Sequence, residues 1–306
     1  MSDSLAHRVH ERIAGMLWRC WRTLGVPAQA EPVRRTLIDP ETLIVLTAWI
    51  ARTGETRTGE ARMATAAADW CRDSHGMLPH ARIRKLVASG DHELVGAVTA
   101  LVALANGAEA GAVSALKFTT KPNVDAEPAV SIRINDPAML RLRLRSLMGP
   151  SARAETLAVL LGAAGKSGGV TSAELAQQTL FGQRHLREAL NHLVYGGWVS
   201  RWRAGAREYH YEVTEQSLQA FGPAPAWTDW ITRSTALIAL SRSVSAIESR
   251  SMDGVGTMMR YVTEAGQSLR SLGVSPPDWH EAGTPEGIAR LESWIDDAVR
   301  RLTEVA

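Results

Sequence analysis

Apolar residues recur every three or four positions over most of the chain, which is the spacing of helices that bury one face. One such stripe runs from Leu5 to Leu24 and stops at Gly25. The pair Asp39-Pro40 places a capping residue before a proline at the first helical position, and so predicts a helix start. Further helices are expected over about 60–74, 79–89 and 91–105.

The pattern weakens in the middle of the chain and then returns. Residues 106–129 have no helical period and predict a loop, after which a short strand is indicated by the alternating Val130, Ile132 and Ile134. Asp136-Pro137 then predicts a helix that runs to Met148. From Ala224 onward apolar stripes predict three more helices, the last of which is opened by Thr284-Pro285.

Residues 151–214 carry start and stop signals in close succession. An apolar helix is expected over Ala154–Ala164, and the glycine-rich run 165–169 ends it. Thr171 and Glu174 have the spacing of a capping box, in which each side chain accepts a hydrogen bond from the other residue's backbone amide. This predicts a short helix from Thr171 to about Thr179.

A second helix and a hairpin follow in the same segment. The helix begins near Gly182 and carries one apolar face, formed by Leu186, Leu190, Leu193 and Val194. The runs 198–203 and 207–213 contain β-formers in partial alternation on either side of Gly205, which predicts a two-stranded hairpin.

This order of elements resembles the winged helix-turn-helix superfamily, in the style of the small bacterial repressors and activators of the ArsR and MarR kind. The resemblance covers about 151–214 and departs from the usual pattern twice, with Leu180 at the turn glycine and Gly182 at the cap of the second helix. The matching positions are Thr171, Leu175, Ala176, Thr179, Leu186, Leu190, Leu193, Gly197, Val199, Gly205 and Tyr211 to Thr214. It implies three helices and a β-hairpin wing, with the second helix of the motif entering the major groove of DNA.

The resemblance also suggests which side chains meet DNA. Arginine can bond guanine with both arms of its fork, and asparagine or glutamine can bond adenine, so the exposed face of the second helix supplies candidate base readers: Gln183, Arg184, Arg187 and Asn191. The hairpin supplies candidate phosphate contacts: Arg201, Arg203 and Arg207. Glu188 on the same helix face would repel phosphate. The alternative is a protein-binding or architectural module whose arginines are simply solvated.

Charge is informative mainly through its position. The net charge is only +2, and four of the 34 basic residues are lysines. Residues 137–153 hold four arginines (141, 143, 145 and 153) and no acid, whereas 224–306 hold eight arginines against eleven acids. We therefore expect the positive charge to be concentrated in the middle of the chain.

The sequence shows no catalytic or metal-binding pattern. The run 162–167 ends in Gly-Lys-Ser but lacks the first glycine of a phosphate-binding loop, because position 160 is leucine. Cys71, Asp73, His75 and His80 lie close together without a zinc spacing. With no signal peptide, no membrane-length apolar run and two cysteines, we expect a cytoplasmic protein that is not an enzyme and needs no cofactor or metal.

We therefore predict a mainly α-helical protein in three parts. Residues 1–135 form a helical domain with a degenerate helix-turn-helix at 39–90, residues 136–222 form the winged helix-turn-helix domain, and 223–306 form a helical bundle or dimer seam. The expected function is a transcriptional regulator that reads double-stranded DNA as a homodimer. The alternative is an antitoxin-like or other interaction protein that binds a protein partner through its helical and winged-helix regions.

Overall fold

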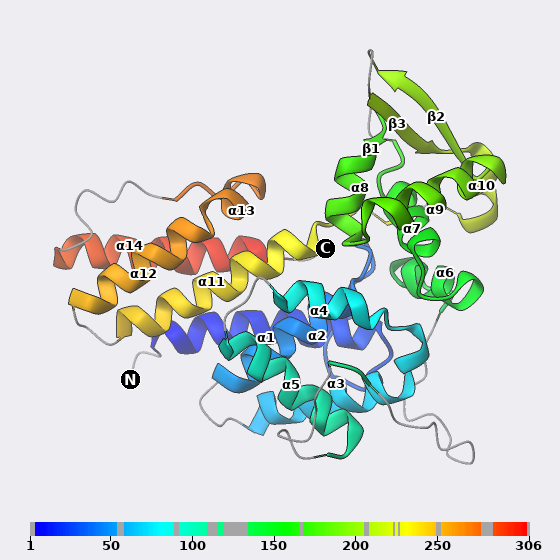
Figure 1. Ribbon diagram of the computed structural model, residues 1–306. Coiled ribbons are helices and arrows are strands. Elements are labelled where there is room, and N and C mark those ends of the chain that lie inside the picture. The colour runs from blue at the N-terminus through cyan, green and yellow to red at the C-terminus, as the bar shows by residue number, and fades with distance from the viewer. Residues whose placement is uncertain are drawn as a thin grey trace.

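The computed structural model describes residues 4–53, 58–88, 92–108, 116–118, 134–165, 168–204, 208–222, 224–225, 227–248, 252–276 and 284–304. Over these residues the chain is mainly helical and carries a small three-stranded antiparallel sheet. Figure 1 shows a large helical body, formed by both ends of the chain, beside a smaller unit that contains the sheet.

The N-terminal helices confirm the helices expected from the apolar stripes. They are α1 (Leu5–Thr23), α2 (Pro40–Thr53), α3 (Thr58–Asp73), the 3-10 turn η1 (His75–Met77), α4 (His80–Ala88) and α5 (His92–Asn106). The first stripe ends where predicted, because Gly25 adopts a left-handed φ of 94° that ordinary residues rarely take. Of the predicted strand at 130–134, only Ile134 belongs to the described residues, and it lies in a turn.

The C-terminal helices pack against the N-terminal ones. They are α11 (Trp230–Glu248), α12 (Met252–Glu264), the unpredicted α13 (Gly266–Ser271) and α14 (Pro285–Thr303), which Thr284 caps as expected. One buried cluster joins Leu17 of α1 to Leu237 of α11 and Val299 of α14. The apolar face of α11 is thus buried within the chain, and residues from 1–135 and 223–306 share one core (Figure 1).

A second, smaller core holds the central part of the chain together. Its elements are η3 (Pro137–Met139), α6 (Leu140–Met148), α7 (Ala152–Gly162), β1 (Val170–Thr171), α8 (Ser172–Thr179), α9 (Gln183–Tyr195), β2 (Val199–Ala204), β3 (Glu208–Val213) and α10 (Glu215–Phe221). Leu157 of α7, Leu190 of α9 and Val213 of β3 meet in this core. The sheet has the order β1-β3-β2, with Val199 opposite Val213 in the hairpin. Sequence analysis predicted the hairpin but neither β1 nor α10.

The expectation that 137–153 forms a basic stretch is wrong for two of its four arginines. Arg141 and Arg145 of α6 are buried, with 1% and 2% of their surface exposed. They belong to a cluster that we call the buried ionic network, which consists of Asp39, Glu41, Arg82, Arg141, Arg145 and Glu155. Its three carboxylates balance three guanidinium groups, so it contributes no net charge to the surface.

The buried ionic network joins the central unit to the N-terminal helices. Arg145 Nη1 donates to Glu41 Oε1 at 2.6 Å, and Arg145 Nε donates to Glu155 Oε1 at 2.6 Å. Burial acts to raise the pKa of Asp39, but the guanidinium groups of Arg141 and Arg82 outweigh it and hold that pKa below its ordinary value. The carboxylate of Asp39 is therefore ionised, and the two arginines compensate its charge inside the protein.

Candidate nucleic-acid interface

The helix pair α8 and α9 is positioned by local interactions that the sequence specifies. Glu174 N donates to Thr171 Oγ1 at 3.2 Å, and Thr171 N donates to Glu174 Oε2 at 2.7 Å, which confirms the predicted capping box at the start of α8. At the other end of α8, Leu180 takes a left-handed φ of 59°. The turn thus has the backbone of a glycine turn, but the residue in it carries a large side chain.

The four predicted base-reading residues of α9 lie together on its exposed side. Leu186, Leu190 and Leu193 are buried against the central core. The opposite face exposes the candidates Gln183, Arg184, Arg187 and Asn191, together with His185, Glu188, His192 and Tyr195. Because residues one helical turn apart share a face, the two arginines and Asn191 form one polar strip along the helix.

The hairpin changes character along its length. Near its base, Val199, Tyr211 and Val213 are buried in the central core. Further out, Arg201 and Arg203 are exposed on β2, and their guanidinium carbons lie 5.4 and 5.2 Å from the centroid of the Tyr209 ring. Arg203 Nε also donates to Tyr209 Oη at 3.1 Å. The outer part of the described strands is thus a cationic surface built on one aromatic ring.

Sequence analysis did not single out Tyr209, although its place opposite Arg203 follows from the hairpin register. The third predicted hairpin arginine, Arg207, lies outside the described residues.

Arg187 of α9 and Arg201 of the hairpin lie near the same side chain, that of Tyr211. Burial raises the pKa of the Tyr211 hydroxyl, and the positive charges of Arg201 and Arg187 act in the opposite direction. Both guanidinium groups therefore lie within electrostatic range of the same phenol. The exposed strip of α9 and the exposed side of the hairpin thus approach each other at Tyr211.

The opposite face of the hairpin holds it against β1. Trp202 lies over Gly169, and a Cβ atom added to Gly169 would lie 2.5 Å from the Trp202 ring. Trp202 also packs at a tilt on the His210 ring, with 6.0 Å between the centroids, and His210 contacts the Gly168 carbonyl. These contacts fix the hairpin relative to the turn before α8. Arg201 and Arg203 are therefore carried by a hairpin that packs against the rest of the unit.

The other patterns in the sequence lie only partly within the described residues. Among the described residues, no group of three or more histidine, cysteine, aspartate or glutamate side chains is placed to hold a metal ion. Cys71 is buried, and burial raises the pKa of its thiol well above the ordinary value. Lys166 and Ser167 lie outside the described residues. No described helix combines the length and the apolar character needed to cross a membrane.

No known protein family, curated protein or solved structure matches this chain.

Proposed function

We propose that this protein is a transcriptional regulator that binds duplex DNA through a winged helix-turn-helix formed by residues 151–214. The observation that carries the proposal is the exposed polar strip of α9 together with Arg201 and Arg203, which are exposed on the hairpin that follows it. The helix order α7, α8, α9, followed by a hairpin whose β3 strand pairs with β1, supports the proposal, because a winged helix has its elements in this order. In such folds the second helix of the motif enters the major groove and the hairpin follows the backbone.

The two parts of the surface suit two kinds of contact. Arg184, Arg187 and Asn191 project from a rigid helix, which is the arrangement needed to reach base edges in the major groove. Arg201 and Arg203 are exposed side by side, and arginines so placed favour phosphate contacts that add affinity without sequence information. Glu188 opposes phosphate on the same strip, and we assign it a position over base edges, where a carboxylate accepts a hydrogen bond from cytosine.

The decisive test is a fluorescence-anisotropy titration with the DNA upstream of the protein's own gene and a scrambled duplex, at several salt concentrations. Replacing Arg184 and Arg187 by alanine should weaken binding to the native duplex by at least tenfold, since one base-reading arginine contributes about 1 to 3 kcal/mol. The matched control replaces Arg34 and Arg35, two exposed arginines outside α9 and the hairpin, and removes the same charge. It should change affinity by less than about twofold.

The salt dependence separates base reading from general attraction. Each phosphate contact contributes about 0.9 to the slope of the logarithm of affinity against the logarithm of salt concentration. Replacing Arg201 and Arg203 by alanine should lower the magnitude of that slope by about 1 to 2 and weaken binding to both duplexes equally. Absence of binding to either duplex at low salt would refute the proposal and favour an interaction protein.

The stoichiometry of the complex tests the homodimer that we propose with this function. Two copies on one two-fold axis would occupy a site with two half-sites about 10 base pairs apart. Sedimentation of the complex with a duplex that carries both half-sites should therefore give two chains per duplex, and a duplex with one half-site should give weaker binding.

A further inference from the structure

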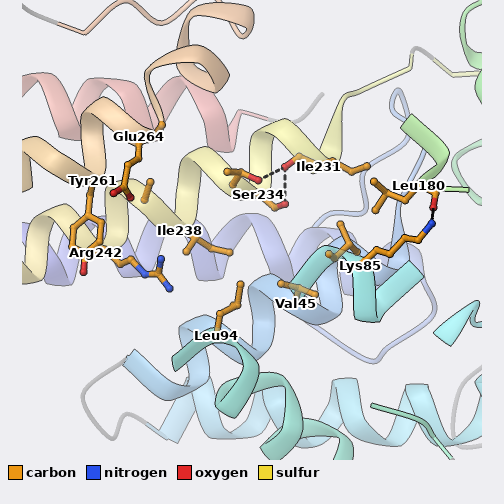
Figure 2. A pocket seen from close by; sticks show the side chains of 14 residues that line it. Val45, Lys85, Leu94, Leu180, Ile231, Ser234, Ile238, Arg242, Tyr261 and Glu264 are labelled. Atoms are coloured by element: carbon orange, nitrogen blue, oxygen red, sulfur yellow. Dashed lines mark hydrogen bonds between the residues drawn. The ribbon is translucent and has the colours of Figure 1, made fainter. Parts of the chain in front are cut away.

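A pocket lies where three parts of the chain meet, away from the exposed strip of α9. Its volume is about 320 Å³, and its walls come from α2, α4, α5, α11 and α12, with Leu180 of the α8–α9 turn closing one end (Figure 2). A cavity of this size accommodates a small organic ligand, and ligand sites in proteins often form between domains. The position of Leu180 connects this cavity to the proposed DNA-binding unit.

The chemistry of the pocket changes from end to end. Figure 2 shows an apolar middle, lined by Val45, Leu94 and Ile238, between two charged ends. One end has Lys85, and the other has Arg242, whose guanidinium lies 4.5 Å from the centroid of the Trp49 ring, together with Tyr261 and Glu264. The two cations exceed the one carboxylate, so the pocket favours a ligand with one negative charge and an apolar body.

Lys85 is the group best placed to take that negative charge. Among the described residues it has no carboxylate within ion-pair distance, and its Nζ donates to the neutral carbonyl oxygen of Leu180 at 2.6 Å. A carboxylate attracts an ammonium group more strongly than a neutral carbonyl oxygen does, because both partners then carry a full charge, and the long lysine side chain reorients easily. At the other end the carboxylate of Glu264, which Arg260 approaches at 3.9 Å, lines the pocket together with Arg242 and makes that end less attractive to an anion.

Loss of the Lys85 hydrogen bond would affect a residue, Leu180, whose backbone conformation is unusual. Leu180 is, among the described residues, the one non-glycine with a positive φ, and its own amide donates to the Ala176 carbonyl at 2.9 Å. Its side chain lines the pocket, which accounts for leucine where a turn of this shape usually has glycine. The Lys85 contact therefore stabilises a strained residue three positions before α9 begins.

We propose that this pocket binds a small monocarboxylate with an apolar body, whose carboxylate draws Lys85 away from the Leu180 carbonyl. The bound ligand would replace one hydrogen bond of the α8–α9 turn by a contact inside the pocket. The effect of this ligand on DNA affinity, through the orientation of α9, rests on the proposed function. The binding of the ligand to the pocket does not.

Calorimetric titration of the full chain with octanoate, octan-1-ol and octylammonium tests the binding without DNA. Octanoate should bind at least tenfold more tightly than either of the other two probes. Lys85→Met keeps the apolar part of the side chain. It should weaken the binding of octanoate by about tenfold and leave the affinity for octan-1-ol unchanged. Arg84→Met removes an exposed charge from the same helix outside the pocket lining, and should leave octanoate binding unchanged. Ile238→Trp fills the cavity and should abolish the binding of both octanoate and octan-1-ol.

Two results would overturn the proposal: no heat of binding with millimolar octanoate, or equal affinities for the three probes that Lys85→Met does not alter. A separate anisotropy titration then adds octanoate to the DNA complex. A changed DNA affinity in the wild type but not in Lys85→Met supports the coupling to α9, and an unchanged affinity refutes it. If no duplex binds at all, the proposed function fails while the calorimetry still decides whether the pocket is a site.

Discussion

Replacement of Glu41 by glutamine should destabilise the protein strongly, although the side chain keeps its size. Glu41 is fully buried and receives hydrogen bonds from Arg145 Nη1 and Nη2 at 2.6 and 2.8 Å, and from Arg82 Nη1 at 2.6 Å. The substitution leaves three buried guanidinium groups with two carboxylates. Its cost therefore comes from an uncompensated buried charge, and not from a cavity.

The magnitude follows from the geometry of the buried ionic network. At an effective dielectric constant of about 20, each of the two ion pairs of Glu41 contributes about 4 kcal/mol of attraction at a charge separation of about 4 Å. Desolvation of the carboxylate, at several kcal/mol, and repulsion from Asp39 and Glu155 offset roughly half of this sum. We expect the free energy of unfolding to fall by about 3 to 5 kcal/mol, which is the range for breaking one partner of a buried pair.

Urea unfolding, followed by circular dichroism and by tryptophan fluorescence, measures the loss. The double variant Glu41→Gln/Arg145→Met restores charge balance and should recover about 1 to 3 kcal/mol relative to the sum of the single variants. As a control, Asp297→Asn removes a carboxylate from the exposed ion pairs of α14 and should leave the midpoint unchanged. A wild-type midpoint for Glu41→Gln, or strict additivity in the double variant, would refute the argument.

Three further changes should be visible in the same urea assay. Burial acts to raise the pKa of Asp39, but guanidinium groups hold it below its ordinary value. The free energy of unfolding should therefore stay constant from pH 7 to 5 and fall below about pH 4, where the carboxylate takes up a proton on unfolding. In Asp39→Asn this fall should be smaller. Gly169→Ala forces a Cβ to within 2.5 Å of Trp202 and should cost about 1 to 3 kcal/mol more than Gly168→Ala, where a Cβ meets nothing. Leu180→Val should cost about 1 to 2 kcal/mol, since β-branched residues fit a positive φ poorly, and hydrogen exchange should localise the loss to the α8–α9 turn; exchange unchanged there would contradict it.

The parts of the fold that sequence analysis predicted are those set by local interactions. Asp136, Thr171 and Thr284 cap the helices expected to follow them, because a cap joins a side chain to an amide two or three residues away. The exposed side of α9 was also predictable, because its apolar residues repeat with the helical period.

The missed elements depend on distant partners. β1 consists of Val170 and Thr171 alone, and it is a strand because Val170 pairs with Tyr211, far along the chain. Arg145 looked like part of a basic stretch, since counting charges over a window cannot reveal that its partner Glu41 is 104 positions away. The acids carried no clear signal of burial either, because Glu41 and Glu155 each stand in the first turn of a helix, where an acidic residue is ordinary.

The contacts of α4 give the candidate interface a mechanical connection to the helical body. Arg82, a member of the buried ionic network, also reaches the carbonyl of Gln178 in the last turn of α8 at 3.5 Å, and one turn later Lys85 bonds Leu180. The Trp227 indole donates to Gln178 Oε1 at 2.9 Å from the other side. Because α9 follows this turn directly, its orientation depends on helices that do not themselves carry the exposed strip. Under the proposed function, variants of α4 should therefore alter DNA affinity while leaving the salt slope unchanged, whereas variants of the hairpin should alter the slope. Measuring affinity and slope together thus distinguishes a positioning role from a DNA contact.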